Sequence, residues 1–196
     1  MSADLWSSDS MSAWRSALDS YSDVVAKQGV ARLPELDRWY REELAALLDA
    51  REPRHVELPE LVRLTEWKMA RGVWRAPNLV LVRSNPATEV IETSARALAQ
   101  VPHPTKPIAT LAKLKGVGPA TASAVAAAAA PSVYPFFDEL VAEQVPSLGK
   151  VAWTLGYYAR YANALRERAR ALGTEWTPVM VERAVWAWVG GKAGTA

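Results

Sequence analysis

Apolar residues recur every three or four positions along most of the chain, and this spacing places them on one face of a helix. Between residues 12 and 27, for example, Trp14, Leu18 and Val25 follow it. No stretch alternates apolar and polar residues long enough to predict a strand, and only the short apolar run at 78–82 is ambiguous between helix and strand. The pattern therefore predicts an all-α fold, a compact multi-helix bundle, with helices at 12–27, 33–50, 60–71, 86–99, 148–172 and 179–189.

Proline and glycine divide this pattern into segments. Pro59 stands where a helix starts well, and Gly72 stands where one ends. Pro102, Pro104 and Pro107 make a stiff linker. We predict an N-terminal helical segment at 1–57, either a separate helical pair or a part of the same bundle, a main domain at 58–189 and a flexible tail at 190–196.

Composition narrows the chemistry. The chain has 196 residues, enough for one or two domains, and no cysteine. Disulfides, a thiolate nucleophile and cysteine-bound zinc or iron–sulfur clusters are thereby excluded. His55 and His103 are far apart in the sequence, so we expect no metal site. The first residues do not resemble a secretory signal, and no apolar run reaches roughly 18 residues, so we expect a cytoplasmic protein without a membrane partner.

The most informative segment is 108–130, where two predicted helices meet at a Gly-Val-Gly turn. Gly116 and Gly118 permit the positive φ of a tight turn and the close approach of another molecule. Val117 can anchor the turn in the core, and Pro119 suits the first turn of the second helix. The free amides at that helix start form an anion site, supported by the helix dipole. Two lysines beside the turn add positive charge for a phosphate, Lys113 and Lys115.

The residues at 114–122, Leu-Lys-Gly-Val-Gly-Pro-Ala-Thr-Ala, resemble the helix-hairpin-helix motif of DNA-binding proteins. A loop with a proline at each end follows at 131–135, and then comes Asp138. This order is similar to that of the helix-hairpin-helix base-excision DNA glycosylases, over roughly residues 80–185. The resemblance implies a DNA-glycosylase-like bundle. In it, Asp138 caps a helix, faces a flipped nucleotide and stabilises positive charge on the sugar as the base departs.

The resemblance also implies which activity and partners to expect. Ala120 stands where bifunctional members carry a lysine, so strand-cleaving lyase activity is not expected. Residues 135–140 differ from the family pattern, with two aromatic residues before Asp138 and Glu139 after it. A monovalent cation at the hairpin carbonyls is compatible with the resemblance, and no other cofactor is implied. Duplex DNA is the implied partner, held at its backbone by Lys113, Lys115, Gly116, Val117, Gly118, Ala120 and Thr121.

A second basic group consists of Lys68, Arg71 and Arg75, which helical spacing places on one side, with Trp74 nearby. Such residues usually form a solvated face, but these three are candidates for contacts with phosphates or for stacking on a base. Large aromatic residues mostly fill cores. We therefore expect Trp67, Trp153, Trp186 and Trp188 in the core. Packing is also the more common role for Trp74, Tyr134, Phe136 and Phe137, and we treat these four as candidate walls of a base pocket beside it.

Three functions remain open at this point. The first is a monofunctional DNA glycosylase of base excision repair, in which Asp138 assists cleavage of the N-glycosidic bond. The second is a non-catalytic DNA-binding module of the same architecture, in which Asp138 only caps a helix. The third is a protein or small-molecule partner, which the net charge of +2 and the nine tryptophans allow.

Overall fold

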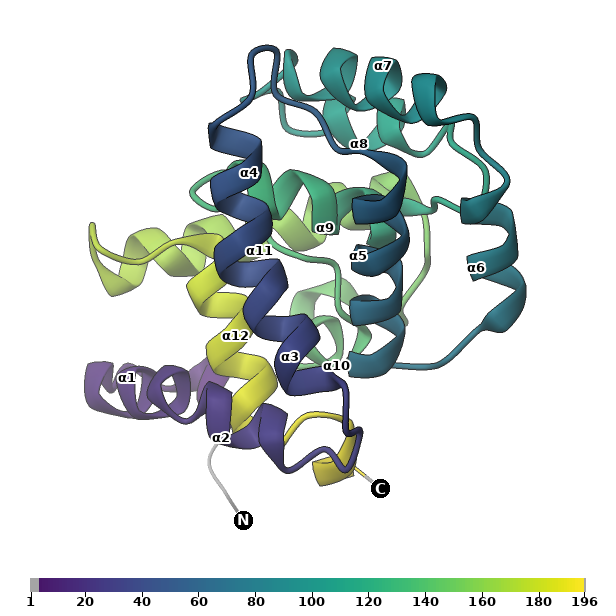
Figure 1. The fold of residues 1–196 in the computed structure, drawn as a ribbon. Coiled ribbons are helices and arrows are strands. Elements are labelled where there is room, and N and C mark those ends of the chain that lie inside the picture. The colour runs from purple at the N-terminus through teal and green to yellow at the C-terminus, as the bar shows by residue number, and fades with distance from the viewer. Residues whose placement is uncertain (1–3, 196) are drawn as a thin grey trace.

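The computed structural model describes residues 4–195, which form helices joined by turns, with no strand among them. Helix accounts for 66% of the structure, so the all-α prediction is confirmed. None of the helices within 4–195 combines the length and the apolarity that a membrane crossing needs. The α-helices (Figure 1) are α1 (Met11–Asp19), α2 (Tyr21–Ala26), α3 (Leu33–Arg38), α4 (Ala45–Asp49), α5 (Leu58–Arg71), α6 (Ala76–Arg83), α7 (Ala87–Leu98), α8 (Lys106–Leu111), α9 (Pro119–Ala129), α10 (Glu139–Glu143), α11 (Leu155–Leu172) and α12 (Pro178–Trp188). The 3-10 helices are η1 (Leu5–Ser7), η3 (Pro146–Leu148) and η4 (Lys192–Thr195), and η2 (Trp39–Leu44) is a π-helix.

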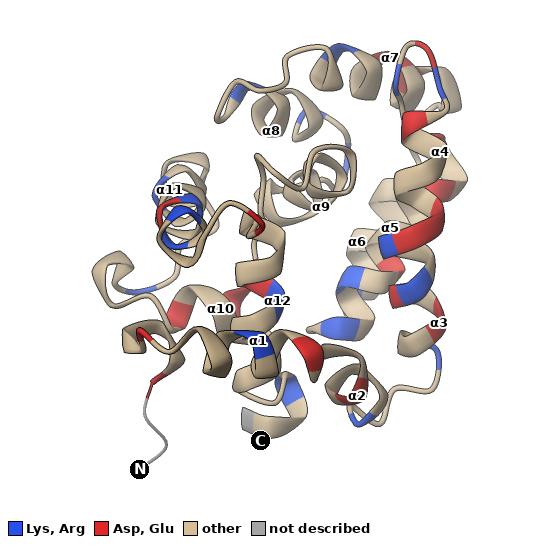
Figure 2. Cartoon of the chain, turned by 90° about the vertical axis from the view of Figure 1, so that its left-hand side faces the viewer, with Lys and Arg blue, Asp and Glu red and all other residues tan. Residues whose placement is uncertain are grey.

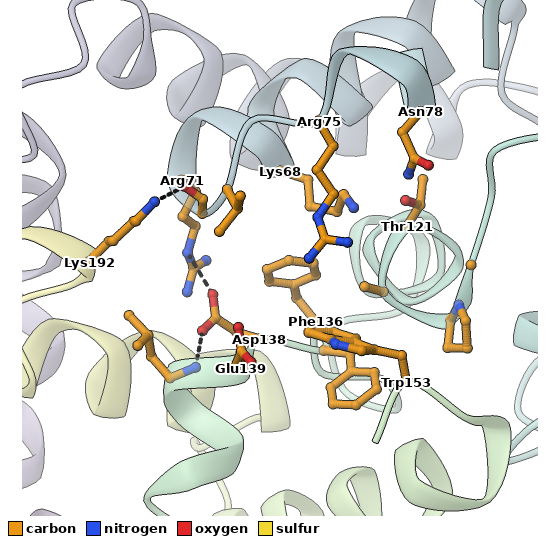
Figure 3. Close-up of a pocket in the computed structure, with 17 residues that line it drawn as sticks. Lys68, Arg71, Arg75, Asn78, Thr121, Phe136, Asp138, Glu139, Trp153 and Lys192 are labelled. Carbon is orange, nitrogen blue, oxygen red and sulfur yellow. Dashed lines mark hydrogen bonds and ion pairs between the residues drawn. The ribbon is translucent and has the colours of Figure 1, made fainter. Parts of the chain in front are cut away.

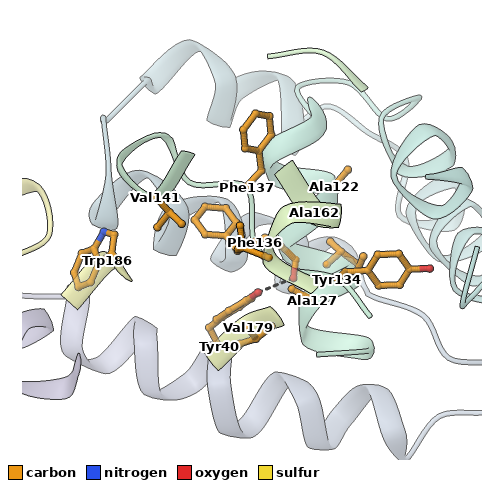
Figure 4. Close-up of a cluster of buried hydrophobic side chains, with 14 of the residues drawn as sticks. Tyr40, Ala122, Ala127, Tyr134, Phe136, Phe137, Val141, Ala162, Val179 and Trp186 are labelled. Atoms are coloured by element: carbon orange, nitrogen blue, oxygen red, sulfur yellow. Dashed lines mark hydrogen bonds between the residues drawn. The ribbon is translucent and has the colours of Figure 1, made fainter. Parts of the chain in front are cut away.

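Helix α9 lies in the interior, where α4, α5 and α8 pack against it (Figure 1). Nearly all its residues are small and most are buried, so the neighbouring helices can approach closely. Tyr40 of η2 donates its hydroxyl to the Ala124 carbonyl at 2.8 Å, and its ring stacks on Trp67 at 3.7 Å between centroids. The same core continues through Phe136 to Trp186 (Figure 4).

The described part of the N-terminal segment, residues 4–57, contributes to this same core. Helices α1 and α2 lie against the C-terminal helix α12 (Figure 1). Trp14 of α1 meets Trp176 edge-on, with ring centroids 6.1 Å apart. Tyr21 of α2 lies 5.4 Å from Trp186 of α12, measured in the same way. These helices therefore belong to the bundle.

The predicted helix at 12–27 is wrong in one respect, because it is interrupted at Ser20. The Ser20 hydroxyl donates to the Ala17 carbonyl at 2.8 Å, and such bonds compete with the helical pattern. The predicted helix at 33–50 is helical throughout, but its middle is the π-helix η2. The ambiguous run at 78–82 is helical and lies inside α6.

The predicted helix at 148–172 is also wrong at its start, because α11 begins only after a loop. Gly149 ends η3 with a φ of +67°, which is outside the helical region. Thr154 then caps α11, since its hydroxyl accepts a hydrogen bond from the amide three residues later at 3.2 Å. The loop between these two residues carries Trp153, which reaches the cavity described below.

The tail predicted to be flexible, 190–196, contains the short helix η4. Gln28, in the turn after α2, contacts this segment: its side-chain amide donates to the Gly190 carbonyl at 3.0 Å, and its oxygen accepts from an η4 amide at 2.9 Å. The Nζ atom of Lys192 donates to the Gly72 carbonyl at 3.1 Å. The C-terminal segment therefore lies beside the end of α5.

Candidate functional site

The glycine turn, which we define as residues 112–118, joins α8 to α9 and packs against α6. Helix α8 ends at Leu111 and so does not reach the Gly-Val-Gly turn, where the sequence predicts that the two helices meet. Gly116 has a φ of +73°, and a Cβ atom there would lie 2.8 Å from the carbonyl oxygen of Asn78. Glycine is thus required for packing onto α6 as well as for the backbone conformation. Val117 is buried, as expected for an anchor, whereas the two flanking lysines, Lys113 and Lys115, are exposed.

Helix α9 starts at Pro119, and no side chain caps its first turn. The amides of Ala120 and Thr121 therefore lack a partner within the helix, and the positive end of the helix dipole lies there. Thr121 is 1% exposed, and its Oγ1 atom has no hydrogen-bond partner among the described residues. Buried hydroxyl groups are usually satisfied. The first turn of α9 thus offers several unused polar groups.

A cavity of about 340 Å³ opens against this first turn (Figure 3). Its walls come from the end of α5, the loop into α6, the start of α9 and the loop before α10. The volume lies within the range of sites for small ligands. Three kinds of side chain give the walls their chemistry: the cations Lys68, Arg71, Arg75 and Lys192, the carboxylates Asp138 and Glu139, and the rings of Phe136, Phe137 and Trp153.

The cavity brings together two groups of residues that the sequence singled out separately. One group comes from the segment around the hairpin, and the other is the basic group at the end of α5. Those that line the cavity are Gly118, Ala120, Thr121 and Asp138 from the first group and Lys68, Arg71 and Arg75 from the second. The remaining predicted contacts, Lys113, Lys115, Gly116 and Val117, lie on the glycine turn outside the cavity wall.

Asp138 stands at the N-terminus of α10 and faces the cavity. Its Oδ1 atom accepts hydrogen bonds from the amides of Leu140 and Val141, at 2.9 and 3.4 Å. The predicted capping role is therefore confirmed. Its Oδ2 atom lies 3.5 Å from Nε of Arg71. The carboxylate is fixed in place from two sides, and the residue is 8% exposed.

Arg71 lies beneath the cavity and is almost completely buried, at 2% exposure. It forms ion pairs with Asp138 and with Glu182 of α12. Aromatic rings surround the guanidinium, and the nearest ring centroid, that of Trp186, is 4.5 Å away. Burial lowers the pKa of Arg71, but the charges of Glu182, Tyr21 and Asp138 raise it above its ordinary value overall. Arg71 is therefore a permanent buried cation that sits between two carboxylates.

Glu182 is the second carboxylate of this buried cluster and is 1% exposed. Burial raises the pKa of Glu182 from its ordinary value of 4.5 to about 7; the charge of Arg71 opposes this shift, and that of Asp138 adds to it. The folded protein therefore holds a proton on Glu182 at pH values where the unfolded chain has lost it.

This proton has a measurable consequence for stability. Because the pKa of Glu182 is raised in the folded state, proton binding at Glu182 adds to the free energy of unfolding. This contribution is fully present below pH 4.5 and is lost as the pH rises to about 7. Glu182→Gln lacks this titration. We expect the free energy of unfolding of the wild type, minus that of the variant, to fall between pH 4.5 and 7 and to stay level above. Urea denaturation at several pH values measures the difference, and a constant difference would contradict the shift.

The aromatic predictions are confirmed for some residues and wrong for others. Trp67 and Trp186 are core residues, as expected, but Trp153 is 45% exposed and Trp188 40% exposed. Of the candidate pocket walls, Phe136 and Phe137 line the cavity, with the ring centroid of Phe137 4.8 Å from that of Trp153. Tyr134 and Trp74 do not line it; Tyr134 is buried elsewhere and Trp74 is 54% exposed.

Sequence reasoning missed three residues of the site and its surroundings: Glu182, Trp153 and Lys192. Only Glu182 carried a signal, because it is a charged residue within an apolar helix stretch, Val-Met-Val-Glu-Arg-Ala-Val. Buried charges are rare unless they are paired, so a partner elsewhere in the chain could have been sought. Trp153 lies in a loop and Lys192 in the C-terminal segment, and the short-range sequence pattern does not predict that either residue reaches the cavity.

The described residues, 4–195, contain no cluster of histidine, aspartate and glutamate that could hold a metal ion. Basic and acidic residues are interspersed along the helices (Figure 2), in keeping with the net charge of +2. The candidate functional groups that remain are those of the cavity and of the adjoining glycine turn. Comparison of the chain with protein-family models, with curated proteins and with solved structures finds no match.

Proposed function

We propose that the protein is a monofunctional DNA glycosylase. The exposed lysines of the glycine turn and the amides at the start of α9 hold the backbone of duplex DNA, and the cavity receives a base flipped out of the helix. One observation carries the proposal: the carboxylate of Asp138 and the first turn of α9 line the same cavity. A strand held at the start of α9 therefore meets a cavity that also contains Asp138, whose carboxylate is fixed by a helix cap and an ion pair.

The chemistry requires few groups. The bond between the base and C1′ of the sugar breaks, its electron pair leaves with the base, and positive charge develops on the sugar. An ionised Asp138 stabilises that charge in a partly desolvated site. Water adds to C1′, and the proton that this water loses is taken up by the departed base. Ala120 has no amine to attack C1′, so strand cleavage through a Schiff base is not part of the proposal. The rings of Phe136, Phe137 and Trp153 offer apolar surface to a base.

A second candidate, a non-catalytic DNA-binding module, is favoured by a specific observation. Both oxygens of Asp138 are engaged, Oδ1 by backbone amides and Oδ2 by Arg71. Arg71 also opposes the stabilisation of a positive sugar, because its own charge lies close to the carboxylate. The two functions differ in whether the cavity responds to charge on the sugar.

Fluorescence anisotropy with two short duplexes separates them. One duplex is intact, and the other contains a stable, positively charged analogue of an abasic sugar. At least tenfold tighter binding of the analogue, about 1.4 kcal/mol, is expected for the glycosylase. Equal affinity for the two duplexes would favour the non-catalytic binding module instead of the glycosylase. Binding to neither would exclude both.

The glycine turn predicts a particular salt dependence. If Lys113 and Lys115 each contact one phosphate, replacing both with glutamine weakens binding to all sequences alike. The slope of log K against log salt concentration then becomes smaller by about 2, since each lost phosphate contact removes roughly 0.9. Lys27→Gln, at an exposed lysine that directly follows α2, is the control. An unchanged slope in the double variant would place the backbone contact elsewhere.

A further inference from the structure

Two cations in the cavity wall have no carboxylate partner. Lys68 and Arg75 form no ion pair within the described residues, although both line the cavity. Arg71, beside them, has two carboxylate partners. Burial, and then the nearby charge of Arg75, lower the pKa of Lys68. Two like charges close together in a partly desolvated wall repel each other, and an anion placed between them would remove that repulsion.

The end of the cavity at Lys68 and Arg75 also contains hydrogen-bond donors, which an anion needs. The Thr121 hydroxyl is buried and has no hydrogen-bond partner, and the first amides of the eleven-residue helix α9 are uncapped. In Figure 3, Lys68, Arg75 and Thr121 gather on one side of the cavity, whereas Asp138 and Glu139 lie on the other. Donors thus converge from α5, from the start of α6 and from α9.

We propose that this end of the cavity binds the phosphate monoester of a nucleotide. Lys68 and Arg75 match its two negative charges, the Thr121 hydroxyl and the α9 amides donate to its oxygens, and its base lies against Trp153. A phosphodiester within a strand carries one charge and continues into the backbone on both sides, so it fits this enclosed set of donors less well. The inference goes beyond the proposed function, because it assigns to the same cavity a ligand, a nucleotide with a terminal phosphate, that need not belong to an intact strand.

Calorimetric titration of the full chain with deoxyadenosine 5′-monophosphate, and with deoxyadenosine, tests the inference. We expect the phosphate to tighten binding at least tenfold. Lys68→Gln and Arg75→Gln should each reduce the affinity for the monophosphate at least fivefold and leave that for the nucleoside unchanged. Lys27→Gln should behave as the wild type.

Thr121→Val tests the loss of a hydrogen-bond donor without a loss of stability. The two side chains have nearly the same shape, and the hydroxyl has no partner in the fold, so the melting temperature should be unchanged or higher. Binding of the monophosphate should nevertheless weaken severalfold. Equal binding of nucleoside and monophosphate by the wild type would overturn the inference, and so would a Thr121→Val variant that binds as the wild type does.

The source of the phosphate is distinguished by a third titration, with a nicked duplex that ends in a 5′-phosphate or a 5′-hydroxyl. A preference for the phosphorylated nick that exceeds the gain seen with the free monophosphate identifies a strand end as the ligand. Tight binding of the monophosphate without duplex binding would overturn the proposed glycosylase and leave this inference standing. Duplex binding that depends on Lys113 and Lys115, with equal affinity for monophosphate and nucleoside, would overturn this inference and leave the proposed glycosylase standing.

Discussion

Replacing Arg71 with methionine is expected to lower the free energy of unfolding by about 3–5 kcal/mol, the usual loss when a buried ion pair loses one partner. The methionine fills similar space but leaves the carboxylates of Asp138 and Glu182 without their cation. Urea denaturation followed by tryptophan fluorescence measures the loss. Since Glu182 can take up a proton, the loss should be smaller at pH 5 than at pH 8.

Arg75→Met is the matched control, because Arg75 lines the same cavity without a carboxylate partner. It should change the free energy of unfolding by no more than about 0.5 kcal/mol. Adding Glu182→Gln to Arg71→Met should recover part of the loss, since one uncompensated charge is then removed. If Arg71→Met proves no more costly than Arg75→Met, the buried cluster does not stabilise the fold in the way its geometry indicates.

Asp138→Asn is expected to reduce release of the base at least a hundredfold, or about 2.7 kcal/mol in the activation free energy. Asparagine is as good a helix cap as aspartate, so α10 should still begin at the same residue. The negative charge facing the cavity is lost, and the ion pair with Arg71 is lost with it. The assay uses duplexes that carry uracil, hypoxanthine, 3-methyladenine or 8-oxoguanine, with the released base measured by chromatography.

Glu139→Gln is the control for this substitution, because it removes a carboxylate from the same wall without touching the pair with Arg71. It should release base as the wild type does. Binding to an intact duplex should be nearly the same in both variants. Full activity of Asp138→Asn would remove Asp138 from the reaction, and a wild type that releases no base from any duplex would leave the binding module as the function.

The features that follow from short-range patterns were predictable. The all-α fold follows from apolar spacing, and the end of α5 at Gly72 follows from a glycine after a periodic run. The cap at Asp138 was also within reach, because an aspartate before a short apolar helix is a common start. These predictions need only a few neighbouring residues, and the structure confirms them.

What could not be predicted depends on contacts between distant residues. Arg71 looked like one of three equivalent basic residues, and only its meeting with Glu182, 111 positions later, makes it a buried cation. Gly116 was expected to permit a positive φ, which it has, and the approach of another molecule, but Asn78 of α6 lies where its Cβ would be. Trp153 was expected in the core because large aromatic residues mostly fill cores, but it lies in a loop that the sequence pattern had predicted as helix.

The partners of Arg71 become available at different times as the chain is synthesised. Arg71 and Asp138 are made well before Glu182, which belongs to α12. Until α12 is available to pack, Arg71 has one of its two carboxylates, and the rings of Trp186 that cover it are missing as well. The buried cluster can therefore be complete only after α12 has been made and has packed against Arg71.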